Sequence, residues 1–404
     1  MNYAFVSTLV PEDMVEELYK ISYQDMQDAA NALQWHIYNG LSKNLNKNIQ
    51  LINVLPVASF PQYCKRAYFR MNTFKISDFS EGINIGFCNI KLIRKKSQTK
   101  NLYKKLKKWV IETEGEKTIF VYSASAVFLK VVSKLKQNYD DIKICLIIAD
   151  LPDFISLSSK RSIVVRWFSS YLAKLSYSYM KCVDYYVLLT KQMATYMNIN
   201  KPFCVMEGIS TEENVDDYPL ERCKNDLKII FYSGTLHRKF GVSNLIKAFT
   251  TISNQNYRLQ ICGVGDCEIE IKNMAEKDKR IEFLGRVKRD KVLQLQKNAT
   301  VLVNPRQNSE EYTKYSFPSK NLEYLSSGVP LIAYKLDGIP DEYDKYIYYV
   351  EDDSIESLSN KLIEICELSN EKRYDFGQKA KEYVIKYKNE ISQTKKIVDL
   401  ISNN

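Results

Sequence analysis

Hydrophobic positions along the chain follow two alternating patterns. Short apolar runs of strand length recur, and residues 142–149 (IKICLIIA) form the most continuous one, as expected of a central parallel strand. Between these runs, apolar residues return every three or four positions, which indicates helices. The predicted strands are residues 3–10, 50–57, 117–122, 142–149, 184–190, 228–232, 258–262, 280–284, 299–303, 329–333 and 346–350. Strands that alternate with helices in this way predict an α/β fold with parallel sheets.

The alternation occurs twice, on either side of an acidic, polar and irregular stretch. A chain of 404 residues is also long enough for two domains. We therefore expect a first domain over residues 1–207, a linker over 208–227 and a second domain over 228–380. Residues 381–404 are expected to form a terminal helix.

Charge and composition restrict the function further. The formal net charge is +10, which fits three partner classes: nucleic acid, an anionic membrane surface or phosphorylated small molecules. The sequence has no run of eighteen apolar residues and no signal peptide pattern, so we expect a cytoplasmic protein.

Nine cysteines without CxxC spacing favour reduced thiols. With only two histidines, His36 and His237, a histidine-based metal site is not expected.

Two basic amphipathic stretches lie in the first domain, at residues 91–110 and 160–182. In the first, Leu102, Leu106 and Trp109 have helical spacing and lysines surround them. Such a segment can lie on an anionic membrane. The alternative is that residues 91–110 form a helix whose apolar face packs on a sheet and whose lysines face solvent.

Residues 315–332 (YSFPSKNLEYLSSGVPLI) contain a turn, a short helix that Gly328 ends, and an apolar strand. Ser319 and Glu323 are four residues apart and share one face of the helix. Unpaired amides at the start of a helix can bind phosphate, and a carboxylate one turn later can hold ribose hydroxyls. The alternative is a helix–strand unit with a surface glutamate.

Glycine turns follow three strands of the second domain. They contain Gly234, the pair Gly263 and Gly265, and Gly285, and such turns allow close approach of the backbone to phosphate. Neither a dinucleotide-binding GxGxxG nor a P-loop is present. Basic residues that could contact a diphosphate lie in the same regions, although each alone could be a surface charge. They are Arg238, Lys239, Arg286 and Lys320.

In the first domain, Asp150 and Asp153 directly follow the strand at 142–149. Ligands bind at the carboxyl ends of strands in open α/β sheets. Asp150 is therefore a candidate for the catalytic site, on the acceptor or sugar side. The alternative is a loop acid that caps the next helix.

Four segments of the second domain carry a resemblance to a known family. They are residues 232–241 (YSGTLHRKFG), 261–266 (ICGVGD), 283–287 (FLGRV) and 315–330. Their order resembles that of retaining GT-B glycosyltransferases of the GT4-like group, particularly those of capsular or other surface polysaccharides. The resemblance is specific over most of residues 228–350 and weaker in the first half. It implies two Rossmann-like domains facing across a cleft, with the last helix crossing back to the first domain.

The resemblance also implies roles for individual residues. Glu323 matches the second glutamate of the family's E-x7-E motif, which holds the ribose. Arg238 and Lys239 lie near the basic pair that neutralises the leaving diphosphate, so they are catalytic candidates beside Asp150. The other positions expected to bind the donor are Gly234, Thr235, Gly263, Gly265, Arg286, Val287, Tyr315, Ser316, Ser319 and Lys320.

The chain departs from the family pattern at two positions. The first glutamate of E-x7-E falls on Tyr315, which changes the contact with the donor sugar, and Glu310 or Glu311 could supply a carboxylate instead. The lysine of the family's K-G pair falls on Phe240. His36 is interpreted as a structural residue, because the catalytic histidine of some relatives has no clear match.

The expected activity is transfer of a hexosyl group, with retention, from a UDP- or GDP-sugar to a glycan acceptor. The acceptor is expected to be polyprenyl-diphosphate-linked and the enzyme peripheral on the inner face of the cell membrane. Lysine and arginine would neutralise the diphosphate without a metal or other cofactor. The alternatives are a non-catalytic partner subunit with a decayed donor site and a nucleic-acid-binding protein, although no nucleic-acid-binding module is recognisable.

Overall fold

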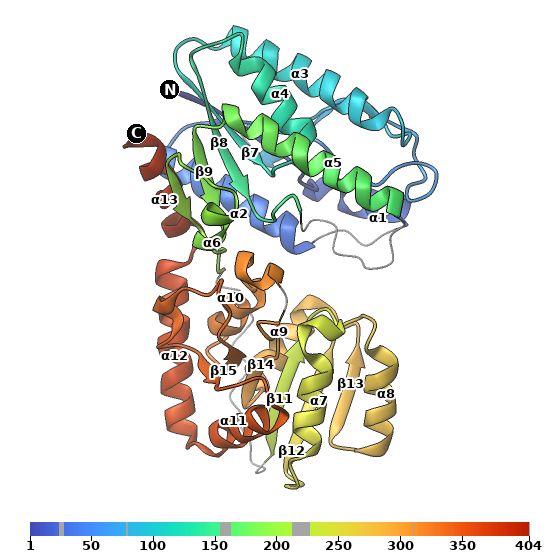
Figure 1. The fold of residues 1–404 in the computed structure, drawn as a ribbon, viewed down its shortest axis with the longest axis vertical. Coiled ribbons are helices and arrows are strands. Elements are labelled where there is room, and N and C mark those ends of the chain that lie inside the picture. The colour runs from blue at the N-terminus through green and yellow to red at the C-terminus, as the bar shows by residue number, and fades with distance from the viewer. Residues whose placement is uncertain (24–27, 78–79, 154–162, 212–226, 310, 404) are drawn as a thin grey trace. The chain divides into compact units, whose positions relative to one another are not determined.

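The computed structural model describes residues 1–23, 28–77, 80–153, 163–211, 227–309 and 311–403. Glu310 and most of the expected linker lie outside these residues. The chain divides into two compact units, which are coloured from blue to red along the sequence in Figure 1. The first unit comprises residues 1–206 and 390–404, and the second comprises residues 207–389.

An eight-stranded sheet forms the centre of the first unit, and only the pairing of β4 with β5 in it is antiparallel. Its central strands have continuous apolar runs because helices cover both faces. In spatial order, the strands are β10 (Phe203–Val205), β9 (Tyr185–Leu188), β8 (Ile142–Ile148), β7 (Lys117–Tyr122), β1 (Asn2–Ser7), β2 (Ile49–Asn53), β5 (Ser80–Asn84) and β4 (Asn72–Ser77).

Figure 1 shows α3, α4 and α5 side by side over one face of this sheet. A small antiparallel pair, β3 (Tyr68–Phe69) with β6 (Phe87–Cys88), lies outside the sheet. The helices are η1 (Glu12–Met14), α1 (Val15–Ile21), α2 (Asp28–Leu45), α3 (Arg94–Glu112), α4 (Ala126–Lys136), α5 (Ile163–Tyr179), η2 (Met180–Cys182), α6 (Lys191–Tyr196) and α13 (Glu390–Ser402). The helical spacing that the sequence shows over residues 12–48 corresponds to η1, α1 and α2, and α1 ends where Ser22 takes an extended conformation.

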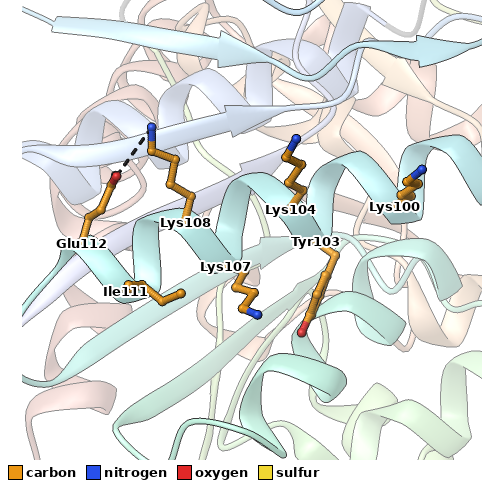
Figure 2. A pocket seen from close by; sticks show the side chains of 7 residues that line it. All are labelled: Lys100, Tyr103, Lys104, Lys107, Lys108, Ile111 and Glu112. Atoms are coloured by element: carbon orange, nitrogen blue, oxygen red, sulfur yellow. Dashed lines mark ion pairs between the residues drawn. The ribbon is translucent and has the colours of Figure 1, made fainter.

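Helix α3 contains the first basic amphipathic stretch. Leu102, Leu106 and Val110 are buried in the core of the unit, so the apolar face packs within the protein. Figure 2 shows the lysines of the outer face around a shallow surface hollow beside Tyr103 and Ile111. No helix among the described residues has both the length and the apolar composition needed to cross a membrane.

The C-terminal helix α13 packs on α2 inside the first unit, as expected. The contact surface of α2 presents residues four positions apart. Gly40 allows the closest approach, because a Cβ atom there would lie 2.4 Å from the carbonyl oxygen of Glu390. Asn44 donates to the carbonyl of Ile391, and the His36 Nδ1 atom lies 3.5 Å from the Glu390 carboxylate.

A six-stranded sheet of parallel strands forms the centre of the second unit. Every residue of the two inner strands β14 and β15 is buried, and aromatic and aliphatic side chains of the helices pack against the sheet. In spatial order, the strands are β13 (Ile281–Gly285), β12 (Tyr257–Cys262), β11 (Lys228–Ser233), β14 (Val301–Asn304), β15 (Leu331–Tyr334) and β16 (Tyr348–Val350).

Helices of the second unit form two groups: α7 packs beside α8 and α11, and α10 packs beside α12. The helices are η3 (Arg238–Phe240), α7 (Val242–Thr250), α8 (Glu268–Lys277), α9 (Arg289–Asn298), η4 (Glu311–Tyr315), α10 (Ser319–Ser326), η5 (Asp341–Tyr343), α11 (Ile355–Glu367) and α12 (Asn370–Tyr387). Because α12 belongs to this unit, the chain returns to the first unit at Glu390 rather than at residue 381.

A buried ion pair joins the two ends of the second unit. Lys388 contacts the carboxylate of Glu207, and the two side chains are only 2% and 1% exposed. The Tyr343 hydroxyl donates to Glu207 at 3.0 Å, and Lys388 also contacts Glu342 at 2.6 Å. The amide of Ser210 donates to the carbonyl of Lys388 at 2.7 Å, so both ends of the unit lie together.

Candidate functional site

Three loops follow strands β11, β12 and β13 of the second unit and are hydrogen-bonded to one another. The Gly234 amide donates to Cys262 at 3.0 Å, and the Gly263 amide donates to Gly285 at 2.8 Å. Gly263 has a φ of 142°, and a Cβ atom there would lie 1.8 Å from the carbonyl oxygen of Gly234. Glycine at this position therefore allows the first two loops to pack directly against each other.

The amides of these glycines donate hydrogen bonds to other groups of the protein. Besides the bonds of Gly234 and Gly263, the Gly265 amide donates to the Glu268 carboxylate at 3.0 Å. A Cβ atom on Gly265 would lie 2.4 Å from the carbonyl oxygen of Leu236. The sequence predicts that these turns allow close approach of a phosphate, and in the structure the three amides donate to other groups of the protein. Thr235, directly after Gly234, is exposed.

Glu323 lies on α10 within a cluster of polar groups. Its carboxylate accepts from Gln296 Nε2 at 2.5 Å and from Lys320 Nζ at 2.9 Å, and Arg289 Nη1 lies 3.9 Å away. Burial raises the pKa of this carboxyl, but Lys320 and the other donors outweigh burial, and the resulting pKa is lower than 4.5. Glu323 is therefore ionised at neutral pH and held in a fixed position, as a ligand for sugar hydroxyls requires.

Sequence reasoning missed Gln296 and Arg289. They are seven residues apart on α9, which is two helical turns, so they lie on one face of that helix. Lys320 was expected to contact a diphosphate, but in the structure it pairs with Glu323. Only the contact between α9 and α10 reveals this cluster, because no local sequence pattern relates the two helices.

The start of α10 has the geometry that the sequence suggested. Pro318 is the N-cap, its φ is −73°, and no side chain caps the helix. The first amides of a helix have no intrahelical acceptor, so this end can accept an anion. Ser319 at the first helical position is exposed. Tyr324 fixes the helix to β11, because its hydroxyl exchanges hydrogen bonds with the backbone of Ser233 at 2.8 and 3.0 Å.

The two basic residues after β11 have different surroundings. Arg238 pairs with Glu270 at 3.1 Å, and its side chain is 73% exposed. Lys239 instead lies over the rings of Phe240 and Tyr312, with Nζ 5.3 and 5.6 Å from the ring centroids. The charge of Arg238 is therefore compensated within the protein, whereas Lys239 has no ion-pair partner among the residues that the structure describes.

Arg306, which sequence reasoning did not assign to the site, follows β14. Its guanidinium lies 4.6 Å from the centroid of Tyr312, and its Nη2 atom donates to the Ser316 hydroxyl at 2.8 Å. The structure thus brings Ser316 next to a cation. Tyr315 is half-buried at the end of η4, and Glu311 at its start is exposed.

Arg286 and Val287 directly follow β13. Arg286 is exposed, and Val287 is half-buried and packs against the hydrophobic core of the unit. Val287 therefore has a structural contact, while Arg286 remains accessible to a ligand at the carboxyl end of the sheet. Within the described part of the chain, no cluster of three or more His, Cys, Asp or Glu residues could hold a metal ion.

Asp150 lies at the end of β8 in the first unit. The residue is exposed to solvent, but the protein atoms around its carboxyl remove part of the water and raise its pKa above the ordinary value of 3.8. Burial, and in second place the negative charge of Asp150, raises the pKa of Tyr122. The neighbouring Asp153 accepts a hydrogen bond from Tyr177 and another from Tyr196 at 3.4 Å. Asp153 therefore has a structural role, and Asp150 remains the candidate carboxylate of this sheet edge.

The raised pKa of Asp150 predicts a pH-dependent change in stability. The pKa of Asp150 is higher in the folded state than in the unfolded state. The Asp150 carboxyl therefore contributes to stability below pH 3.8, and this contribution is lost as the pH rises through the folded pKa. Asp150→Asn is therefore expected to raise the Tm at neutral pH and to change it less below pH 3.8. Thermal melts across this range test the expectation, with the exposed Asp13→Asn as the control. A larger stabilisation at low pH would contradict it.

Comparison with known proteins supports the fold. The family model described as "Glycosyl transferases group 1" matches residues 220–383. No sequence among the curated proteins matches the chain. Sucrose-phosphate synthase from Thermosynechococcus elongatus is similar in structure, with a TM-score of 0.66 and 13% identity, and 100% of this chain and 99% of that chain are covered.

Two other solved structures are similar over nearly the whole of both chains. The lipopolysaccharide outer core galactosyltransferase WaaB has a TM-score of 0.64 and 15% identity, and 100% of this chain and 99% of that chain are covered. HepE from Anabaena, solved in complex with UDP, has a TM-score of 0.62 and 12% identity, and all of both chains is covered. These likenesses show the GT-B fold.

Proposed function

We propose, on the premise that this chain is a retaining GT-B glycosyltransferase of the GT4 group, that its second unit binds a UDP- or GDP-sugar. The observation that carries the proposal is the cluster around Glu323. An ionised carboxylate, fixed by Gln296 and Lys320, lies on the helix whose uncapped start can accept a diphosphate. WaaB is a galactosyltransferase and HepE was solved with UDP, which supports a nucleotide-sugar donor.

In the proposed reaction, a hexosyl group moves to a glycan acceptor with retention of anomeric configuration. The leaving diphosphate accepts the proton of the acceptor hydroxyl, so the enzyme mainly positions the reactants and stabilises the developing charge. Lys239 and the start of α10 are proposed to stabilise that charge. Asp150 is proposed to contact the acceptor or the transferred sugar, and no metal is required.

The acceptor is proposed to be a glycan on a polyprenyl diphosphate, in surface polysaccharide synthesis. Helix α3 supports this proposal, since its outer face is rich in lysine while its apolar residues are buried. Figure 2 shows Lys100, Lys104, Lys107 and Lys108 along α3, and Lys108 also pairs with Glu112 at 3.5 Å. Each lysine near an anionic membrane would contribute about 1 kcal/mol. We therefore propose peripheral binding to the inner face of the membrane through electrostatic attraction.

A second candidate is a non-catalytic partner subunit whose donor site has decayed. Tyr315 favours this candidate, because a tyrosine stands where the family resemblance implies a carboxylate. Turnover of UDP- and GDP-sugars with a lipid-linked acceptor distinguishes the two. Nucleotide binding without transfer or hydrolysis across the donor panel would favour the partner subunit.

Glu323→Ala tests the proposed contact with the ribose. Removing hydrogen bonds to a charged group should weaken UDP or GDP binding by roughly 10- to 150-fold. Titration calorimetry should also show that the variant no longer distinguishes a ribonucleotide from its 2′-deoxy analogue. Loss of affinity without loss of this discrimination would contradict the assignment.

The matched control is Glu282→Ala in the same unit. Glu282 also accepts a hydrogen bond from a glutamine, Gln260, at 2.8 Å, but it lies on β13 away from α10. This variant should bind the nucleotide as the parent does. Equal losses in both variants would indicate a general disturbance of the unit.

A further inference from the structure

Arg306 is a half-buried cation without an acidic partner. Among the residues that the structure describes, no carboxylate lies within 4.0 Å of its guanidinium. One hydrogen bond joins Nη2 to the Ser316 hydroxyl, and the buried Nε atom has no hydrogen-bond partner. A planar group with five donors thus keeps at least one buried donor without an acceptor in the protein.

Two aromatic rings hold Arg306 in place. Its guanidinium carbon lies 4.6 Å from the centroid of Tyr312 and 5.5 Å from that of Phe240. The Nζ atom of Lys239 lies over the same two rings. Two cations therefore share one aromatic pair, and neither has a carboxylate partner in the described part of the chain.

Such an arrangement is costly without an anion. Burial lowers the pKa of Arg306, since water is partly removed from the charged group. Contact with ring faces compensates only about 0.5–2 kcal/mol per cation, and two like charges repel each other. The buried Arg280 of the same unit pairs with Asp278 at 2.7 Å, and the buried Arg373 donates to two backbone carbonyls and to Asn370.

Arg306 also has a defined place in the sheet. It follows β14, whose neighbour is β11, and Lys239 follows β11. The loops after these strands are in contact, because a Cβ atom on Gly241 would lie 1.8 Å from the carbonyl oxygen of Pro305. Both cations therefore lie at the carboxyl edge of a parallel sheet, where ligands of such folds bind.

We propose that Arg306 binds the donor's diphosphate together with Lys239 and is a catalytic residue of the transfer. The inference rests on the proposed function and adds a cation that the sequence motifs did not indicate. The bond that breaks joins the anomeric carbon to a diphosphate oxygen, which keeps the electron pair. The bond that forms joins the same carbon to an acceptor oxygen, whose proton passes to the leaving phosphate. Arg306 stabilises the negative charge on that phosphate.

The test compares nucleoside diphosphates with nucleosides. UDP, GDP, uridine and guanosine are titrated into the full-length protein, Arg306→Gln and Arg66→Gln. Arg66 is a suitable control because it also lies over an aromatic ring, 5.5 Å from the centroid of Phe69, but pairs with Glu17 in the first unit. Arg306→Gln should weaken binding of the preferred diphosphate by roughly 10- to 150-fold and leave binding of its nucleoside unchanged. Arg66→Gln should change neither.

Two further variants separate a loss of charge from a loss of structure. Arg306→Lys should retain part of the diphosphate affinity. In Arg306→Gln, the additional change Phe240→Lys returns a positive charge to the neighbouring loop, and it should restore part of the affinity. Equal loss for nucleoside and diphosphate, with no recovery in either variant, would overturn the proposal in favour of a structural role.

The outcomes also distinguish this inference from the proposed function. If the parent protein binds no nucleoside diphosphate, the proposed function fails and the inference fails with it. If the parent binds UDP or GDP and Arg306→Gln binds it equally well, only the inference fails. A loss confined to a uronic-acid donor such as UDP-glucuronate, relative to UDP-glucose, would place Arg306 at the sugar instead and overturn the diphosphate assignment.

Discussion

Lys388→Met is expected to lower the free energy of unfolding of the second unit by about 3–5 kcal/mol, because it leaves the Glu207 carboxylate buried without its cation. Lys388 and Glu207 are 2% and 1% exposed, so water cannot replace the lost partner. Tyr343 would still donate to Glu207 at 3.0 Å, but a neutral donor does not compensate a buried charge. Chemical denaturation followed by circular dichroism and tyrosine fluorescence measures the change, because the three tryptophans all lie in the first unit.

The double variant Glu207→Leu with Lys388→Met is the control. Replacing both members of a buried ion pair by apolar residues is often nearly neutral, so most of the lost stability should return. Lys335→Met is a second control, since Lys335 pairs with Asp341 but is 36% exposed, and its loss should cost at most about 1 kcal/mol. A similar cost in Lys335→Met and Lys388→Met would contradict the importance of burial.

Gly263→Ala is expected to destabilise the second unit by about 3–4 kcal/mol and to abolish nucleotide binding. The new Cβ atom would lie 1.8 Å from the carbonyl oxygen of Gly234, so the two loops must separate. The positive φ of Gly263 adds a further cost of about 1–2 kcal/mol for a residue with a side chain. Differential scanning calorimetry should show a Tm lower by roughly 10 °C.

Gly285→Ala provides a control in the adjacent loop. Gly285 also has a positive φ, 63°, but a Cβ atom there meets nothing within 4 Å. Only the backbone cost of about 1–2 kcal/mol is expected, with nucleotide binding retained. If the two variants lose equal stability, the close contact between the loops does not explain why position 263 requires glycine.

Elements whose burial is uniform could be predicted well from the sequence. The apolar run at residues 117–122 is strand β7, with every residue buried, and the run at 142–149 corresponds to β8. The helical spacing over residues 12–48 indicated helix but not where α1 ends, because the period of apolar residues does not mark that end. The end of the second unit was also placed too early, since helical spacing continues through α12 and does not show which sheet the helix covers.

The site was predictable only where its residues are near each other in sequence. Ser319, Lys320 and Glu323 share one helix, so spacing alone related them. Gln296 approaches Glu323 from another helix, and Arg306 reaches Ser316 across a loop. These contacts depend on how strands β11, β14 and β15 are ordered in the sheet, which no local pattern of residues determines.

The packing of α13 on α2 has a consequence for protein synthesis. The residues of α13 leave the ribosome after the whole second unit, yet they belong to the first unit. Until then, the surface of α2 around Gly40 has no partner, although the whole second unit has already been translated. The first unit can therefore be completed only after translation of the second, and a chain terminated after Asn389 would lack the helix that covers this surface.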